Sequence, residues 1–245
     1  AWGSDGMFFH GQNWKANAVF SMQDIWTLDP AFLNRIPVWI PWFPVDKEPL
    51  PINVIQKIQF AYKILCFSKF GYDLLLNSGF AARLIYEGTD TDIFRPRDKQ
   101  EMRKKWGIPL DAFLFMMIGA NKENPPRKGY QESLEAFKMF HEKHPEAALL
   151  VNNQQRAPGG FPIREYANHL GIAGRTFFIN DYLSMWLCSS EEIAQQYGAC
   201  DAILHPSQTE GFGLCIIEGQ SCGRPAIIQN CQSQPELIVE GKTGF

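Results

Sequence analysis

The sequence predicts an α/β protein, and its C-terminal half predicts a doubly wound parallel sheet. Short apolar runs, typical of buried strands, alternate along the chain with segments of helical spacing. The connections between them are short and contain Gly, Pro, Asn and Asp. The 245 residues are 45% hydrophobic and 20% charged, which is ordinary for a globular protein of one large or two modest domains.

The N-terminal half alternates strand and helix, which indicates an α/β layer. Residues 36–43 form an apolar run interrupted by two prolines, and this favours an extended, proline-interrupted strand or a loop over a regular central strand. We expect strands at residues 17–22, 64–68 and 82–86, and helices at residues 52–62 and 70–76.

Residues 87–96 interrupt this alternation with Gly, Asp and Pro, so we interpret them as an interdomain connection. The predicted domains are residues 1–96 and 97–245. A basic run surrounds the boundary, and we interpret it as a solvated helix face, with contact to an anionic membrane surface as the alternative. The run consists of Arg95, Arg97, Lys99, Arg103, Lys104 and Lys105.

The C-terminal half alternates more regularly. Ser189 and Glu192 have the spacing of a capping box at the start of one helix. The predicted strands are residues 113–119, 148–152, 176–179, 202–205 and 226–228, and the predicted helices between them include residues 131–141, 163–170 and 189–197. Ligands of such a sheet bind beyond the carboxyl ends of its strands.

The segment 205–218 follows one of these strands and combines a glycine-rich loop with a short helix. Gly211 and Gly213 flank the start of that helix, where backbone N–H groups lack intrahelical partners and suit an anion such as phosphate. Glu218 lies within the otherwise apolar helix, and a carboxylate there needs hydrogen-bond partners. Either a neighbouring protein group or the hydroxyls of a sugar can supply them.

A second loop, residues 120–129, also follows a predicted strand and leads into a helix. Arg127 and Lys128 stand at the start of that helix, where each cation costs about 0.3–1 kcal/mol against the helix dipole. A bound polyanion would reverse that penalty, and exposure of both side chains to water is the alternative. Neither a complete G-x-G-x-x-G nor a G-x-x-x-x-G-K-[ST] motif occurs, which disfavours dinucleotide dehydrogenases and P-loop enzymes.

The segment HPSQTEGFGLCIIE, with Glu210 and Glu218 separated by seven residues, resembles the signature of family 4 glycosyltransferases. Residues 88–96 and the Arg-Lys-Gly sequence at 127–129 also resemble that family. The resemblance implies a GT-B fold: two Rossmann-like domains facing a cleft, here with an incomplete N-terminal domain. It also implies a retaining hexosyltransferase that uses a nucleoside-diphosphate sugar, with no cofactor and no metal.

The family motifs also imply roles for individual residues. Glu210 and Lys128 would be catalytic, and Glu218 would bind the donor ribose. The donor diphosphate would contact Lys128, Arg127, Lys122 and the backbone near Phe212, Gly213 and Leu214.

Other assignments rest on position alone. Asn180 and Asp181, at the end of a predicted strand, are candidates for the donor base. Asp24 and Asp46 follow apolar runs in the N-terminal half and are candidates for the acceptor, with surface or capping roles as the alternative. Trp39, Trp42 and Phe43 could stack on a sugar ring or pack in the core.

The remaining features limit partners and location. A net charge of −3 argues against nucleic acid, while a saccharide or lipid-linked acceptor is expected. The six cysteines form no C-x-x-C pair, and no signal peptide is recognised, so we expect a cytoplasmic location, either free or at a membrane surface. We also expect a fragment cut at both ends. A GT-B epimerase or phosphorylase and a non-catalytic nucleotide-sugar-binding module are the alternative functions.

Overall fold

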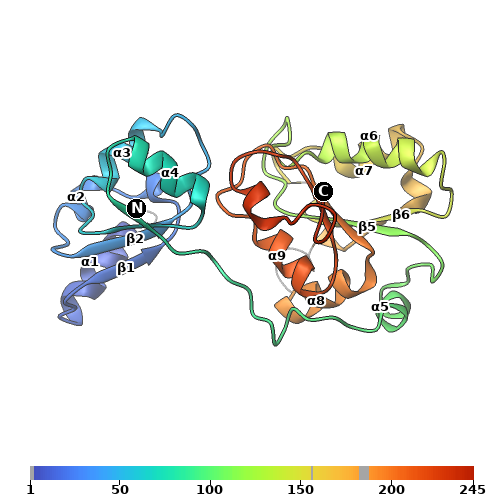
Figure 1. Ribbon diagram of the computed structural model, residues 1–245, viewed down its shortest axis with the longest axis horizontal. Helices are drawn as coiled ribbons and strands as arrows, with labels where there is room; N and C mark the ends of the chain where they lie inside the picture. Colours follow the sequence, from blue (N-terminus) through green and yellow to red (C-terminus); the bar gives the residue numbers. More distant parts are fainter. Residues whose placement is uncertain (1–2, 156, 182–187) are drawn as a thin grey trace. The chain divides into compact units, whose positions relative to one another are not determined.

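The computed structural model describes residues 3–155, 157–181 and 188–245. The chain divides into two compact units, which we describe separately (Figure 1). The N-terminal unit contains residues 1–87 together with Glu210–Phe212, and the C-terminal unit contains residues 88–209 and 213–245.

The N-terminal unit has a four-stranded parallel sheet in the order β1-β2-β3-β4. Its strands are β1 (Val19–Met22), β2 (Trp39–Phe43), β3 (Ile64–Cys66) and β4 (Ala82–Leu84). Its helices are α1 (Ser4–Asn13), η1 (Ile25–Thr27), α2 (Pro30–Leu33), α3 (Ile52–Ile58) and α4 (Lys69–Asn77). The sequence did not predict α1 or α2, because α1 contains two glycines and α2 has only four residues.

The prediction that residues 36–43 do not form a regular central strand is wrong, because β2 pairs with both β1 and β3. The carbonyl of Trp39 accepts from the N–H of Tyr62 at 2.8 Å, so the backbone N–H and C=O of Trp39 point toward β3. The backbone groups of Pro41, two residues further along the strand, point in the same direction. Its missing N–H falls ahead of the β2–β3 pairs, which begin at Trp42. The same bond takes Tyr62 out of the helix predicted for residues 52–62, and α3 ends at Ile58.

Two of the three candidate stacking aromatics lie in the core of the N-terminal unit. The side chains of Trp39 and Phe43 are fully buried there. Trp42 is half-buried, donates from Nε1 to the carbonyl of Ile85 at 2.9 Å and packs edge-on against Phe67. Core packing is therefore the role of Trp39 and Phe43.

The C-terminal unit confirms the predicted doubly wound sheet. All five strands are parallel, in the order β7-β6-β5-β8-β9. They are β5 (Leu114–Ile118), β6 (Ala148–Asn152), β7 (Thr176–Phe178), β8 (Ala202–His205) and β9 (Ala226–Ile228). The helices are α5 (Lys99–Trp106), α6 (Tyr130–His141), α7 (Ile163–His169), α8 (Ser190–Ala199) and α9 (Leu214–Ser221), with η2 (Ala173–Arg175) and η4 (Gln234–Leu237).

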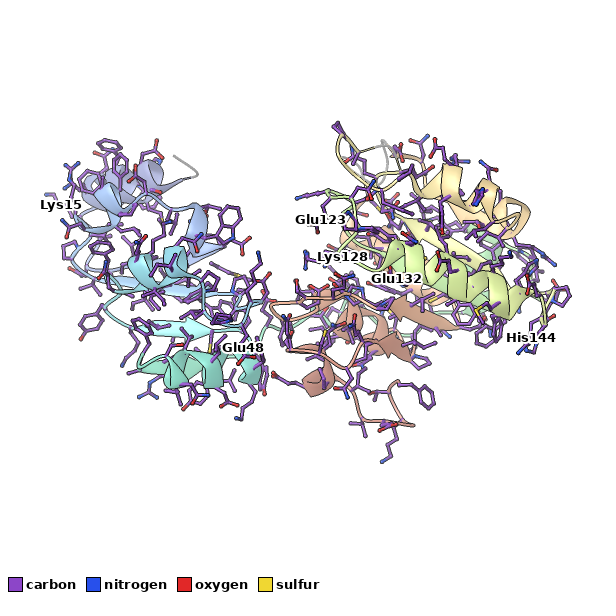
Figure 2. The ribbon with its side chains drawn as sticks, turned by 90° about the horizontal axis from the view of Figure 1, so that it is seen from above. Lys15, Glu48, Glu123, Lys128, Glu132 and His144 are labelled. Carbon is purple, nitrogen blue, oxygen red and sulfur yellow. The ribbon has the colours of Figure 1, made fainter. Side chains whose placement is uncertain are left out.

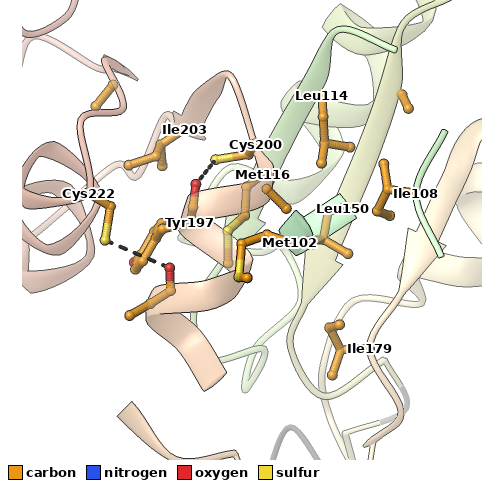
Figure 3. Packing of buried hydrophobic residues seen from close by; sticks show 14 of the residues in the cluster. Met102, Ile108, Leu114, Met116, Leu150, Ile179, Tyr197, Cys200, Ile203 and Cys222 are labelled. Carbon is orange, nitrogen blue, oxygen red and sulfur yellow. Dashed lines mark hydrogen bonds between the residues drawn. The ribbon is translucent and has the colours of Figure 1, made fainter. Parts of the chain in front are cut away.

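Alternate residues of the central strands face opposite layers of helices. Phe115 and Met117 of β5 pack with α6 and α7, which lie on one face of the sheet (Figure 1). Leu114 and Met116 pack on the other face with residues of α5, α8 and α9, including the fully buried Tyr197 (Figure 3). Both faces are covered, as expected for a parallel sheet.

The basic run is not simply a solvated helix face. Arg103 of α5 is only 2% exposed and donates to Asp201 at 2.6 Å, as well as to the carbonyls of Ala199 and Leu110. Lys99 pairs with the other oxygen of Asp201 at 2.8 Å, and Arg97 pairs with Glu191 at 2.7 Å. The prediction failed at Arg103 because two of its partners, Asp201 and the carbonyl of Ala199, lie about a hundred residues away in the sequence.

Candidate functional site

The loops that follow β5 and β8 lie side by side at the carboxyl ends of the strands of the C-terminal sheet. The two strands pair in parallel, with Met116 opposite Ile203. The strand order reverses between them, because β5 continues to β6 on one side and β8 continues to β9 on the other. This is the topological switch point, where ligands of doubly wound sheets bind.

The two loops touch at Gly129, a contact that we call the loop seam. Gly129 has φ +67°, and a Cβ there would lie 2.4 Å from the carbonyl oxygen of Pro206. The N–H of Gln208 donates to the carbonyl of Arg127 at 2.8 Å across the same contact. Only glycine tolerates both this backbone angle and this close approach to Pro206. The glycine contact and the Gln208 hydrogen bond together hold the two loops against each other.

Arg127 strengthens the loop seam and does not simply extend into water. Its Nη1 donates to the carbonyl of Thr209 and to the hydroxyl of Thr209 at 3.1 Å. Its Nε pairs with Glu123 at 3.2 Å, and one third of the side chain is exposed. Arg127 therefore connects the β5 loop to the residue that directly precedes Glu210.

Two helices begin at this edge without a side-chain cap. Gly129 is the N-cap of α6, and Gly213, with φ +117°, is the N-cap of α9. By contrast, α8 has the predicted capping box between Ser189 and Glu192. The first N–H groups of an uncapped helix remain available, and together with the helix dipole they favour an anion.

Lys128 directly precedes the N-cap of α6 and adds a positive charge at the start of that helix. The side chain is half-buried, and its Cδ and Cε lie 3.8 Å from where a Cβ of Gly119 would be. Figure 2 shows Lys128 and Glu132 toward one end of α6, with His144 beyond the other end. The stem of Lys128 would thus be in ordinary van der Waals contact with a side chain at position 119, whereas the hydroxyl of Tyr130 would lie closer, at 3.1 Å.

Glu218 of α9 has a protein partner that the sequence did not reveal. The hydroxyl of the fully buried Tyr197, on α8, donates to its carboxylate at 3.1 Å. Burial raises the pKa of Glu218, and the Tyr197 bond only partly opposes that shift. Burial also raises the pKa of Tyr197 well above its usual value, so Tyr197 stays a donor. A carboxylate in an apolar helix indicated the need for a partner, but no pattern identified Tyr197.

The other predicted donor residues differ in exposure. Glu210 is 8% exposed, and Phe212 is also buried. Leu214 is 40% exposed at the start of α9, and Lys122 is exposed on the β5 loop. Lys122, Lys128 and Leu214 thus belong to the two loops of the C-terminal unit, whereas Glu210 and Phe212 group with the N-terminal unit.

The candidate base residues follow β7. Asn180 is exposed, whereas the carboxylate of Asp181 accepts from the N–H of Gln155 at 2.9 Å. Gln155 in turn donates from its side chain to the carbonyl of Ile179 at 2.6 Å. Asp181 therefore fixes the loop after β7 against the loop after β6.

The candidate acceptor residues lie in the N-terminal unit, at the carboxyl ends of the paired strands β1 and β2. Asp24 is exposed and precedes η1 without a side-chain cap, although its carbonyl accepts from the hydroxyl of Thr27 at 2.6 Å. Asp46 is half-buried. Asp24 and Asp46 therefore lie on the same side of that sheet, at the carboxyl ends of its strands.

No group of three or more His, Cys, Asp or Glu side chains could hold a metal ion among residues 3–155, 157–181 and 188–245. No helix in that same part of the chain is long and apolar enough to cross a membrane.

Solved structures with the same fold are glycosyltransferases. Sucrose-phosphate synthase from Thermosynechococcus elongatus superposes with a TM-score of 0.77, covering 99% of this chain and 63% of that chain at 19% identity. A glycosyltransferase from Rickettsia africae gives 0.73, covering 99% and 65% at 19% identity. The fold is thus the GT-B type of α/β fold.

The sequence identifies the family. Residues 98–245 match the family described as glycosyl transferases group 1, and the chain belongs to that family. A D-inositol 3-phosphate glycosyltransferase from Mycobacteroides abscessus is 28% identical over 66% of this chain and 34% of its own length. A second protein of this name, from Catenulispora acidiphila, is 30% identical over 64% of the chain and 36% of its own length. The chain spans about a third of the length of these relatives.

Proposed function

We propose that the C-terminal unit binds a nucleoside-diphosphate sugar and that the protein transfers a hexose-type sugar from it, with retention, to a glycan, lipid or other acceptor. The observation that carries this proposal is that α6 and α9 both begin without a side-chain cap after the strands at the switch point of the sheet, and that Lys128 directly precedes the N-cap of α6. Family membership supports the reaction class, and the names of the relatives support a glycosyl donor.

The diphosphate would lie against the starts of α6 and α9. The amides around Phe212, Gly213 and Leu214 and the ammonium of Lys128 would offset the negative charge that develops as the glycosidic bond breaks. Lys122 is exposed on the loop after β5, and its ammonium could contact the phosphates as a point charge. These groups supply the counter-charge without a metal or a cofactor.

The two glutamates would hold the two sugars of the donor. Glu218, fixed by Tyr197, would accept from the ribose hydroxyls, and Glu210 would accept from hydroxyls of the transferred sugar. Asn180 and Asp181 would flank the base, and Asp24 and Asp46 would serve the acceptor. Membrane contact through the basic run is not part of the proposal, because Arg97, Lys99 and Arg103 already have acidic partners.

Titration calorimetry with UDP and GDP tests the donor site directly. We expect the chain to bind at least one of them, and incubation with UDP- and GDP-hexoses followed by NMR should show retained configuration in any transferred sugar. Absence of binding by both nucleotides would refute the donor site. Binding with no transfer by any longer natural form of the protein would favour the non-catalytic alternative.

Glu218→Gln should separate the binding role of this carboxylate from its effect on stability. The amide oxygen can still accept from Tyr197, but the lost charge should weaken nucleotide binding about tenfold. Because burial raises the pKa of Glu218, the native state holds this proton to higher pH than the unfolded state, and stability falls as the pH rises through the raised pKa.

Glutamine cannot ionise, so Glu218→Gln should also raise the melting temperature at pH 7 while changing it little below the pKa of an exposed glutamate. Calorimetry gives the affinity, and thermal unfolding at both pH values gives the stability. An unchanged nucleotide affinity would remove Glu218 from the ribose site.

A further inference from the structure

His205 and Cys215 stand at the two ends of the loop that carries Glu210. His205 is the last residue of β8, and Cys215 is the second residue of α9. The Sγ of Cys215 lies 3.5 Å from Nδ1 and 3.6 Å from Nε2 of the His205 ring. This contact closes the base of the loop, so the start and the end of the loop both depend on the space around one sulfur atom.

The surroundings of this pair suit a reactive thiol. Cys215 is half-buried and within reach of a small reagent, whereas His205 is only 2% exposed. A neutral imidazole has one nitrogen without a proton, and that nitrogen can accept the proton of a neighbouring thiol. The resulting thiolate is the nucleophilic form of cysteine, and the first turn of a helix is a favourable place for an anion.

Four other cysteines have surroundings that disfavour the thiolate or exclude reagents. Cys66, Cys200 and Cys222 are buried, the latter two in the core of the C-terminal unit (Figure 3). Burial raises the pKa of Cys200 to about 12 and that of Cys222 to about 11. Burial also raises the pKa of the half-buried Cys188. We therefore expect these four thiols to react slowly.

Cys231 is the matched comparison for Cys215, because it is half-buried too. Its thiol donates to the carbonyl oxygens of Ser207 and Gln208, at 3.6 and 3.3 Å, and its Sγ accepts from Nε2 of Gln234 at 3.2 Å. Carbonyls and amides hold a thiol in place but do not remove its proton. The two thiols thus share a similar exposure and differ in the imidazole beside Cys215.

We propose that Cys215 is a modification site: with His205 as the base, its thiolate reacts with hydrogen peroxide, and the product disturbs the anion site at the start of α9. The sulfur attacks one peroxide oxygen, so that an S–O bond forms and the O–O bond breaks. Sulfur is oxidised to sulfenic acid and the peroxide is reduced. The departing hydroxide takes the proton that His205 had accepted and leaves as water.

The effect on binding follows from the position of the pair, and this part of the inference rests on the proposed function. An added oxygen must fit beside the buried ring of His205, so the end of β8 or the start of α9 has to move. Gly213, two residues before Cys215, is the N-cap of α9, whose first N–H groups the proposed diphosphate would contact. Oxidation should therefore weaken nucleotide binding, and reduction of the sulfenic acid by a thiol reagent should restore it.

Alkylation resolved by site tests the thiol itself. Iodoacetamide forms an S–C bond as iodide leaves, and mass spectrometry of peptides follows each cysteine separately. In the folded chain, Cys215 should react at least about tenfold faster than Cys231, since the thiolate is the attacking species. His205→Gln and His205→Asn should each slow Cys215 by at least about tenfold and leave Cys231 within about twofold. Equal rates for Cys215 and Cys231 in the unaltered chain, or an unchanged Cys215 rate in both His205 variants, would overturn the proposal.

Calorimetry with UDP and GDP before and after treatment with hydrogen peroxide tests the effect on binding. Affinity of the unaltered chain should fall at least about tenfold, dimedone should trap the sulfenic acid at Cys215, and dithiothreitol should restore binding. Cys215→Ser should keep its affinity within about twofold after peroxide. The control Cys231→Ser should lose affinity as the unaltered chain does.

The outcomes separate the thiol from the donor site. Full nucleotide affinity in a chain oxidised at Cys215 would refute the coupling between this thiol and binding, as would an equal loss in the treated Cys215→Ser chain. If the unaltered chain binds neither UDP nor GDP, the proposed donor site fails, and the alkylation rates still decide whether His205 activates Cys215.

Discussion

Replacing Lys128 by alanine is expected to weaken UDP or GDP binding by about 10- to 100-fold. A hydrogen bond to a charged group contributes roughly 1.5–3 kcal/mol, and each 1.4 kcal/mol corresponds to about a factor of ten in affinity. Lys128 directly precedes the uncapped start of α6, so its loss would leave a bound diphosphate with the amides and the exposed Lys122. The fold should be little affected, because the side chain is only partly buried.

Lys143→Ala is the matched control for this measurement. Lys143 is exposed just beyond the C-terminal end of α6, at the opposite end of the helix from Lys128. The Lys143→Ala substitution removes the same charge from the same region of the sequence but leaves the site unchanged. Equal affinities of the Lys128 and Lys143 variants would show that Lys128 does not contact the phosphates. Raising the salt concentration should reduce nucleotide affinity more in the unaltered chain than in the Lys128 variant.

Asp201→Ala should lower the free energy of unfolding of the C-terminal unit by about 3–5 kcal/mol, because it leaves the buried guanidinium of Arg103 without its counter-charge. The two carboxylate oxygens of Asp201 accept from Arg103, Lys99 and the N–H of Leu114, at 2.6, 2.8 and 2.7 Å. The substitution thus also breaks a link between the start of β5 and the start of β8.

Hydrogen exchange of the β5 and β8 amides measures this effect within the C-terminal unit alone. Glu142→Ala is the control, since Glu142 pairs with Lys138 at 3.9 Å on an exposed surface and should contribute less than about 0.5 kcal/mol. Unchanged protection of β5 and β8 in the Asp201 variant would show that Arg103 finds another partner or becomes hydrated.

Most of the C-terminal fold could be predicted because its strands are short apolar runs buried on both faces. Residues 148–152, 202–205 and 226–228 match β6, β8 and β9 residue for residue. The N-terminal unit was harder. Pro41 is tolerated in an interior strand only because its missing donor falls outside the β2–β3 pairs, a detail of register that local sequence does not contain.

The candidate site could be predicted in outline but not in its connections. The spacing of glycines and charges located both loops, since helix starts have local signatures. The partners that fix them are remote: Thr209 is 82 residues from Arg127, and Tyr197 is 21 residues from Glu218. Asn153, directly after β6, went unnoticed because a buried amide with no hydrogen-bond partner in the described part of the chain is recognisable only once its surroundings are known.

The contact of Gly129 with Pro206 has a consequence for engineering. The two segments meet backbone to backbone, so neither can be exchanged for a relative's version without a matching surface on the other. Chimeras designed to alter donor preference should therefore transplant residues 119–129 and 205–213 as a single cassette.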